Sequence, residues 1–180
     1  METHFRDPTD ITAVNVMTSP AIACREEMRL EEVAEVLGDH RISGLVVVDA
    51  NDRLVGMISE RDIAHALGGP LMRLAVRRPA REGDADRRFA IEGARVASDV
   101  MSSPVVIGRP DTSVRALAHE MAEKQINRIP IVDDERLIGV VTRGDVLKGV
   151  GGIELHPTPV KDPVILGSGI AGSTVSPRDH

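Results

Sequence analysis

Apolar residues recur at helical spacing in two segments of the chain, and each segment is followed by two short apolar runs. The helical positions are Leu30, Val33, Ala34 and Leu37 in the first segment and Val114, Leu117, Ala118 and Met121 in the second. Residues three and four positions apart lie on one face of a helix, so each segment is predicted to be a helix with one buried face. The apolar runs, at 45–48, 54–58, 129–132 and 137–141, are rich in β-branched residues and are separated in pairs by polar turns. This pattern predicts two β-hairpins of buried strands.

The second half of the chain repeats the first. Pro20 aligns with Pro104 at an offset of 84 positions, and after one deletion in the hairpin turn Asp62 aligns with Asp145. Short apolar strands are also expected at 22–23 and 106–107, and further helices at 60–67 and 144–148. Pro130 within a strand indicates a position whose N–H has no partner, as at a strand start or edge. The predicted fold class is therefore α/β, of the α+β kind, with a strand-helix-strand-strand-helix unit made twice.

The remaining segments differ from the units in composition. The expected division is an extension at 1–13, the first unit at 14–67, a connector at 68–96, the second unit at 97–149 and a tail at 150–180. Seven arginines fall between 68 and 95, interleaved with acids, which is typical of a solvated or intersubunit surface. The tail is rich in glycine and proline and is expected to be extended. Its apolar residues Val160, Val164, Ile165 and Leu166 could dock it as a strand.

The composition argues against several classes of function. The chain has no Trp or Tyr, only two Phe, and a net charge of −6, so nucleic-acid binding by ring stacking and membrane-surface binding are not expected. The lone Cys24 and the spacing of the six histidines predict neither a disulfide framework nor a metal site. There is no apolar run of about 18 residues and no signal-peptide pattern, so a cytoplasmic protein is expected. No nucleophile, base and orienting group stand at recognisable spacing, so no enzymatic activity is expected.

Two motifs mark the ends of each unit. Met-Thr-Ser-Pro at 17–20, or Met-Ser-Ser-Pro at 101–104, precedes it, and Gly-x-x-Ser/Thr-x-x-Asp at 56–62 or 139–145 closes its hairpin. With the repeated helix and strand pattern between them, these motifs resemble a pair of CBS domains, also called a Bateman module, of the stand-alone prokaryotic type. The resemblance implies two units packed sheet to sheet about a pseudo-two-fold axis, with two clefts between them.

The resemblance implies a regulatory function. Such clefts bind adenosine-containing ligands, with AMP or ATP most expected here and ADP, NAD or S-adenosylmethionine as further candidates. The nucleotide would be a regulatory ligand, with no cofactor required, and its binding would change the packing of the units. A homodimer is expected, and a protein effector of unknown identity would receive the signal.

The resemblance also implies roles for individual residues, since each cleft joins the closing motif of one unit to the leading segment of the other. The ribose hydroxyls would bind Asp62 and Asp145, whose carboxylates make strong charge-assisted hydrogen bonds. The phosphate would bind Ser59, Arg61, Arg128, Thr142 and Arg143, near helix N-termini. The adenine would lie against Thr18, Ile22, Ala23, Ile42, Ser43, Ser102, Val106, Ile107, Ile126 and Asn127. Because the counterpart of Arg128 is Gly44, the cleft with Asp62 is preferred for a phosphate-rich ligand.

Two alternatives remain open at this point. Ser59 with Asp62, and Thr142 with Asp145, also fit a capping box, in which hydroxyl and carboxylate satisfy the N–H groups of their own helix. The cap and the ligand contact can coexist. At the level of function, the alternative is a ligand-free dimeric scaffold that recruits a partner through the arginine-rich connector or the tail.

Overall fold

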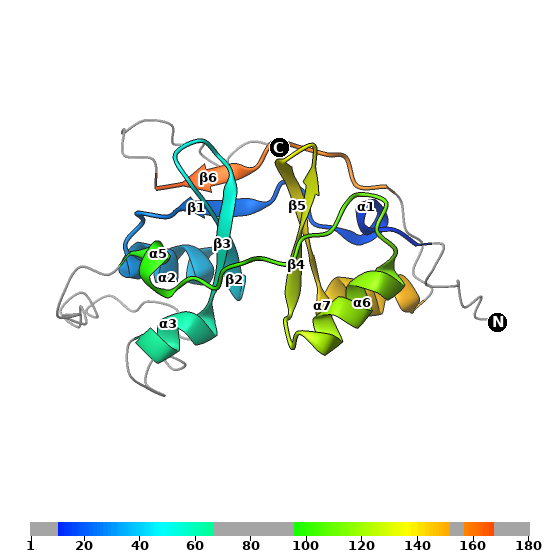
Figure 1. Cartoon of the computed structure of the whole chain (residues 1–180), viewed down its shortest axis with the longest axis horizontal. Helices are drawn as coiled ribbons and strands as arrows, with labels where there is room; N and C mark the ends of the chain where they lie inside the picture. Colours follow the sequence, from blue (N-terminus) through cyan, green and yellow to red (C-terminus); the bar gives the residue numbers. More distant parts are fainter. Residues whose placement is uncertain (1–10, 67–95, 152–156, 168–180) are drawn as a thin grey trace, which may run out of the picture.

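The structure of the chain is a computed structural model that describes residues 11–66, 96–151 and 157–167 (Figure 1). The predictions made for the arginine-rich connector, and for residues 1–10 and 168–180 at the ends of the chain, lie outside these residues. Within them the predicted mixture of helices and strands in two tandem units is confirmed. The two hairpins stand at the centre of Figure 1, and the longer helices lie on the outer sides.

The first unit is built on a four-stranded sheet. Its strands are β1 (Ile22–Arg25), β2 (Gly44–Val48), β3 (Leu54–Ser59) and β6 (Val164–Leu166), in the order β3-β2-β1-β6. The hairpin β2–β3 is antiparallel, as the polar turn predicted, whereas β1 lies parallel to β2 because α2 (Leu30–Asp39) crosses over between them. The residues Leu30, Val33 and Leu37 of α2 are buried, so the predicted apolar face does pack on the sheet. The unit closes with α3 (Glu60–Ala66).

The second unit repeats this plan with two strands fewer among the described residues, since it lacks counterparts of β1 and β6. It contains α6 (Val114–Glu123), the antiparallel hairpin of β4 (Arg128–Asp133) and β5 (Arg136–Thr142), and α7 (Arg143–Val150). The strand expected at 106–107 is reduced to a bridge from Gly108 to Ile131. If the parallel strand continued from Gly108 back to residue 106, the carbonyl of residue 106 would need the N–H of residue 130, which proline lacks. In the first unit the counterpart is Val46, which pairs with Ala23, so β1 forms there.

The two short leading helices exchange places between the units. These helices are α1 (Ala13–Val16) and α5 (Ala97–Val100). Ala13 lies in one hydrophobic cluster with Val114 and Leu117 of the second unit, and Ala97 lies in another with Leu30 and Ile63 of the first. In Figure 1, accordingly, α1 lies beside α6 and α7, and α5 beside α2 and α3. Each core is therefore completed by residues from the other half of the sequence.

Backbone hydrogen bonds fix both crossings. The N–H of Thr18 donates to the carbonyl of Val140 (2.9 Å) and the N–H of Val140 donates to the carbonyl of Thr18 (3.1 Å). In the other crossing, Met57 and Ser102 exchange the same two bonds (3.1 and 2.8 Å). Each leading segment thus pairs with the closing strand of the other unit.

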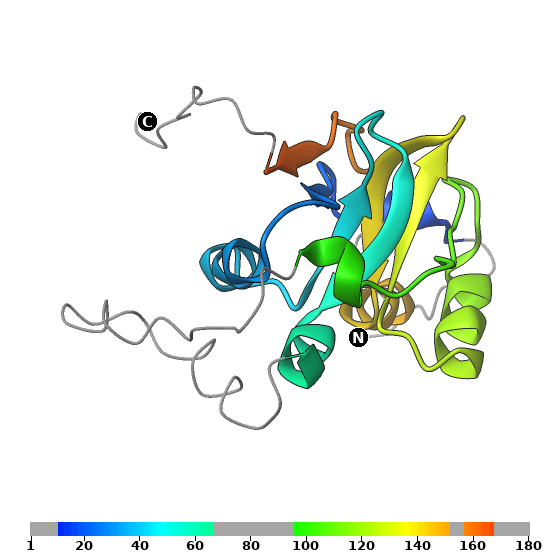
Figure 2. The ribbon, with the colours of Figure 1, turned by 60° about the vertical axis from the view of Figure 1, so that its left-hand side comes forward.

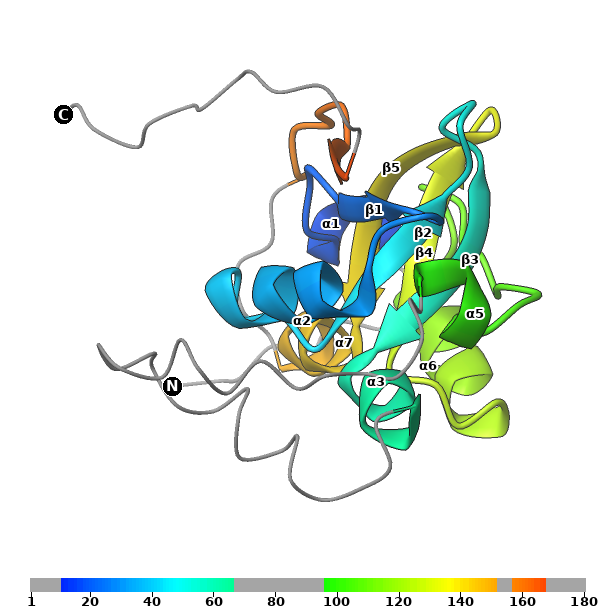
Figure 3. The same cartoon turned by 90° about the vertical axis from the view of Figure 1, so that its left-hand side faces the viewer.

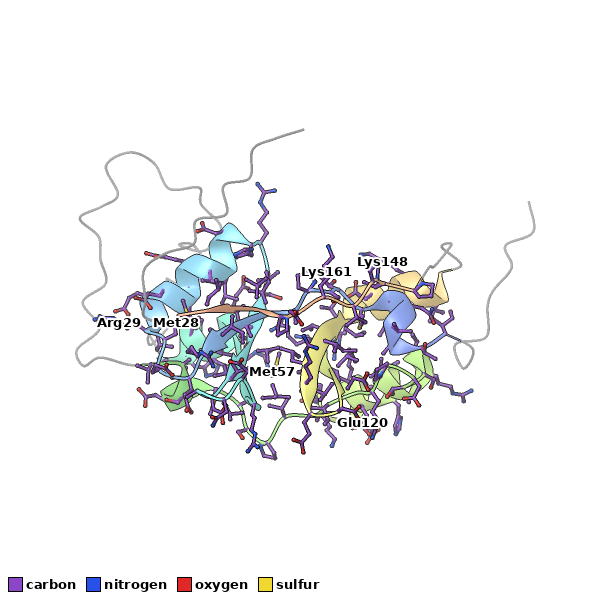
Figure 4. All side chains as sticks on the ribbon, turned by 90° about the horizontal axis from the view of Figure 1, so that it is seen from above. Met28, Arg29, Met57, Glu120, Lys148 and Lys161 are labelled. Carbon is purple, nitrogen blue, oxygen red and sulfur yellow. The ribbon has the colours of Figure 1, made fainter. Side chains whose placement is uncertain are left out.

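A third apolar cluster joins the two sheets. It buries Ala21, Ala23, Val46, Val48 and Leu137, with Met57 and Val140 packed against it. Met57 lies between the two units in the view from above (Figure 4), and the hairpins face one another in Figures 2 and 3. This sheet-to-sheet contact is the packing that the sequence resemblance implied.

The tail crosses both units as a strap, which residues 157–167 define here. The N–H of Thr158 donates to the carbonyl of Val14 (2.9 Å), and the N–H of Val164 donates to that of Ala21 (2.9 Å). Asp162 forms an ion pair with Arg136 of the second unit, and β6 pairs with β1 of the first. The prediction that the tail docks as a strand is confirmed for Val164–Leu166, although Val160 stays outside it, 54% exposed.

Removing the strap should destabilise the fold. A stop codon after Gly151 deletes β6, whose half-buried Ile165 and Leu166 should stabilise the protein by about 1.5–3 kcal/mol together, since full burial of one such side chain contributes about that much. The measurement is the free energy of unfolding in urea. A stop codon after Gly167 is the matched control, because it keeps the strap. Equal stability of the two truncated proteins would contradict the structural role of β6.

Candidate functional site

Both closing motifs form capping boxes at the start of a helix. The Oγ of Ser59 and the Oγ1 of Thr142 each donate to the Oδ2 of the aspartate three residues later, at 2.6 Å. The backbone N–H groups of Ser59 and Thr142 donate to the same carboxylate oxygens, at 2.7 and 2.9 Å. The cap interpretation is therefore confirmed for both motifs. These bonds converge on Oδ2, so Oδ1 of Asp62 is the oxygen that a ligand could engage, whereas Oδ1 of Asp145 lies 3.6 Å from Lys148 Nζ.

Loss of the hydroxyl in the second cap should lower stability. The Oγ1 of Thr142 accepts from the N–H of Asp145 (3.3 Å), one of the N–H groups that have no partner within the helix. Thr142→Ala is expected to reduce the free energy of unfolding by about 0.5–2 kcal/mol, whereas Thr142→Ser should keep most of it. Chemical denaturation of the three proteins measures the difference. A serine variant as unstable as the alanine variant would show that the methyl group matters rather than the cap.

The first cleft lies between the closing motif of the first unit and the leading segment of the second; we call it the Asp62 cleft. It has a volume of about 230 Å³. Its lining residues are Met57, Ile58, Ser59, Arg61, Asp62, Ser102, Pro104, Val105, Val106, Gln125, Ile126, Asn127 and Arg128. Aliphatic walls, a carboxylate and two arginines thus meet in one cavity formed by both units.

The second cleft is the counterpart formed by the closing motif of the second unit; we call it the Thr142 cleft. It is larger, at about 460 Å³. Its lining residues are Thr18, Pro20, Ala21, Ile22, Arg41, Ile42, Ser43, Gly44, Asn127, Arg128, Val140, Thr142, Arg143 and Gly144. Three arginines and no carboxylate are among them, so this cleft is more electropositive than the Asp62 cleft.

Most of the predicted site residues come together in the pairing that the resemblance implied. Ser59, Arg61 and Asp62 meet Ser102, Val106, Ile126, Asn127 and Arg128 in one cleft, and Thr142 and Arg143 meet Thr18, Ile22, Ile42 and Ser43 in the other. Three predicted residues do not line either cleft. Ala23 is fully buried in the sheet, Ile107 is 53% exposed on the surface, and the carboxylate of Asp145 lies in its cap with Oδ1 3.6 Å from Lys148 Nζ.

Sequence reasoning missed Arg41, and it missed that the Arg128 side chain fills the space beside Gly44. Arg41 has a φ of 54° and its counterpart Gln125 a φ of 53°, so both sit in the left-handed region after their helices. The turn places Arg41 in the Thr142 cleft and Gln125 in the Asp62 cleft. The place of Arg41 in a cleft is hard to predict from sequence, because an Arg after a helix is usually solvent-exposed.

Arg128 lines both clefts, as does its neighbour Asn127. The Nη2 of Arg128 donates to the Oγ of Ser43, which lies in the other unit. Burial lowers the pKa of the guanidinium below its usual value, while the charges of Glu60 and Asp62 act in the opposite direction. Because Arg128 lines both cavities, its presence does not by itself favour the Asp62 cleft, as the sequence comparison with Gly44 suggested.

Cys24 is buried in the first core and should be inert as a thiol. Burial, the largest effect, raises its pKa from 9.0 to about 12, and the nearby charge of Glu27 adds to it. We expect no labelling by iodoacetamide in the folded protein up to about pH 9, and full labelling in urea. Because the pKa is higher in the folded state, stability should also fall as the pH rises from 9 towards 12, and Cys24→Ala should lack that fall. Rapid labelling of the native protein would contradict the buried position.

None of the helices in the described part of the chain is long and apolar enough to cross a membrane. Nor do the described His, Cys, Asp and Glu residues gather in a group of three suited to a metal ion.

Comparison with known proteins places the chain among proteins of the same architecture. The uncharacterized protein MJ1426 of Methanocaldococcus jannaschii is 32% identical over 152 residues, which cover 76% of this chain and 89% of that protein. Among solved structures, the CBS domain pair of protein MJ0100 in complex with 5′-methylthioadenosine and S-adenosyl-L-methionine superposes with a TM-score of 0.62. It is 26% identical and the match covers 80% of this chain and 98% of that one.

A second structure shows the same likeness. CBSX2 in complex with AMP superposes with a TM-score of 0.58 at 27% identity, over 77% of this chain and 94% of that one. The sequence profile of the CBS domain matches residues 11–69 and 97–152, which together make up more than half of the chain and coincide with the two repeats. The chain therefore belongs to the CBS-domain family.

Proposed function

We propose that the chain is a regulatory module that binds adenosine-containing ligands in the Asp62 and Thr142 clefts. The observation that carries the proposal is that each cleft is lined by the closing motif of one unit and the leading segment of the other. A ligand in either cleft would contact both units at once. The ligands of the two related structures, AMP in one and S-adenosylmethionine with methylthioadenosine in the other, support the class of ligand.

The chemistry of the walls suits the three parts of such a ligand. Val106 and Ile126 in the Asp62 cleft, and Ile22 and Ile42 in the Thr142 cleft, offer aliphatic surfaces against which adenine can pack without an aromatic ring. The Oδ1 of Asp62 can accept from the ribose hydroxyls. Arginines in both clefts can form charge-assisted hydrogen bonds with phosphate oxygens.

The signal would arise from the arrangement of the units. The units touch through the sheet-to-sheet cluster and the two crossings, so a ligand that binds one arrangement better than another shifts the population between them. A partner protein, or a second copy of the chain as expected from the resemblance, would detect this change. The strap crosses both units and would move with it.

The test is to identify the ligand that the protein carries and to measure its affinity. Protein purified without added nucleotide is denatured and the released small molecules are identified by mass spectrometry. Titration calorimetry with AMP, ADP, ATP, NAD and S-adenosylmethionine then gives the affinities. The proposal expects at least one adenosine compound to bind with up to two molecules per chain. If none of them binds and none is released, the chain is better explained as a ligand-free scaffold.

A further inference from the structure

The pseudo-two-fold symmetry of the chain breaks at residues 44 and 128, which lie between the clefts. Residue 44 and residue 128 are counterparts in the sequence repeat, and each begins the first strand of a hairpin. Their neighbours are similar in kind, since Ser43 corresponds to Asn127, and both line the Thr142 cleft. At the next position, however, one unit has a glycine and the other an arginine.

The structure explains why only one of the two positions carries a side chain. The Arg128 guanidinium reaches across to the first unit and lies against Gly44. A Cβ on Gly44 would stand 1.7 Å from Arg128 Nη1 and 2.8 Å from the carbonyl oxygen of Ile58. Contacts this short do not occur between real atoms, so the space near the symmetry axis admits one side chain. A second arginine could not stand beside the first.

The guanidinium has a neutral partner and is reachable from both sides. The Arg128 guanidinium donates a hydrogen bond to the hydroxyl of Ser43. None of the ion pairs formed between described side chains includes Arg128, although Glu60 and Asp62 lie near enough to favour its charge. It lines the Asp62 cleft and the Thr142 cleft alike. A partly desolvated cation without a carboxylate partner is a strong site for an anion.

We propose that Arg128 is one phosphate-binding cation shared by the two clefts, so that a phosphate-bearing nucleotide in one cleft weakens the binding of a second in the other. This inference rests on the proposed function. It also makes the coupling depend on ligand chemistry. Two nucleotides would compete for the same charge, whereas a nucleoside without phosphate would bind either cleft independently.

The competition has a direct electrostatic reason. A guanidinium turned towards a phosphate in one cleft directs its paired N–H donors to that anion and has its charge neutralised. The second phosphate then enters a cleft in which Arg128 is already paired with an anion. Arg61 remains for the Asp62 cleft, and Arg41 with Arg143 for the Thr142 cleft, so the second molecule still binds, but more weakly.

The experiment uses AMP and adenosine as probes and full-length variants in which one cleft is filled. Ile126→Trp fills the Asp62 cleft and Ile42→Trp fills the Thr142 cleft; the two isoleucines are half-buried counterparts. Arg128→Gln is added to each, and Arg109→Gln, an exposed arginine outside both clefts, is the matched control. Calorimetry gives the dissociation constant in each case.

We expect Arg128→Gln to weaken AMP binding by about 10-fold or more in both single-cleft proteins, since it removes charge-assisted bonds, and to leave adenosine binding within about 2-fold. Arg109→Gln should change neither. In the protein with both clefts open, the second AMP should bind about 5-fold or more weakly than it does to the same cleft alone. Arg128→Gln should remove this difference.

The ratio of the two AMP dissociation constants in the protein with both clefts open, measured with and without Arg128→Gln, needs no tryptophan variant and decides the question if those variants fail to fold. The proposal would be overturned if the two AMP molecules bind independently and Arg128→Gln leaves the ratio of their dissociation constants unchanged. A loss of AMP affinity in one single-cleft protein and not in the other would also overturn it. In both outcomes adenosine still binds and the proposed function stands. If neither AMP nor adenosine binds, the proposed function itself fails.

Discussion

Replacing Ala97 with aspartate is expected to loosen the first unit, although residue 97 belongs to the second repeat of the sequence. Ala97 is fully buried among Leu30, Ile63 and the other core residues of the first unit. The new carboxylate would have to lose its hydration there without a cationic partner, which costs several kcal/mol. That is a large part of the roughly 5–15 kcal/mol that stabilises a typical domain. Hydrogen exchange should therefore show early loss of protection in α2, β2 and α3.

Two further variants make this expectation specific. Ala13→Asp, at the counterpart position, should loosen α6, β4 and α7 first, because Ala13 is buried in the core of the second unit. Ser98→Asp is the matched control, since Ser98 is exposed on the same short helix as Ala97. A loss of protection that begins in α6 and α7 for Ala97→Asp would contradict the exchange of the leading helices between the units.

The parts of the fold that depend on local pattern were predictable from the sequence. The helix at 30–39 follows from apolar residues three and four positions apart, and the hairpins follow from β-branched runs on either side of a polar turn. The sequence repeat then allowed the elements predicted in one half to be checked against those predicted in the other. The predicted ends of the hairpin strands differ from the observed ones by no more than one residue, as for β4, which begins at Arg128 rather than Ile129.

The parts that depend on distant contacts were not predictable from local pattern. Nothing within residues 97–100 shows that Ala97 packs on Leu30, because that contact is set by the position of the whole other unit. The reduced strand beside Pro130 needed its neighbour in space as well as the missing N–H. The shared position of Arg128 is of the same kind. The repeat pattern marks Arg128 as a cation near one cleft. Its position in both clefts depends on the missing side chain at Gly44, against which the guanidinium lies.

The two aspartates show how the same motif leads to different positions. They align in the repeat and make the same cap, yet Asp62 lines its cleft and Asp145 does not line the other. Asp145 Oδ1 also lies 3.6 Å from Lys148 Nζ. In α3 the counterpart of Lys148 is His65, so Asp62 has no lysine at the corresponding position. We therefore expect unequal contributions to ligand binding from the two carboxylates.

Asp62→Ala is expected to weaken adenosine binding in the Asp62 cleft by about 10- to 150-fold. A carboxylate that accepts from the ribose hydroxyls contributes about 1.5–3 kcal/mol through charge-assisted bonds, and adenosine isolates this contact because it has no phosphate. Asp145→Ala should have a smaller effect, since its carboxylate is outside the lining of the Thr142 cleft. The measurement is calorimetric titration with adenosine of the wild-type protein and both variants.

The control separates the ribose contact from the helix cap. Ser59→Ala removes the hydroxyl that bonds Asp62 Oδ2 at 2.6 Å and keeps the carboxylate, so it should lower stability by about 1 kcal/mol while adenosine affinity stays within about 3-fold. If Ser59→Ala weakens adenosine as much as Asp62→Ala does, the aspartate acts by holding α3 in place. If Asp62→Ala leaves adenosine binding unchanged, the ribose is held by another group, and the carboxylate serves the cap alone.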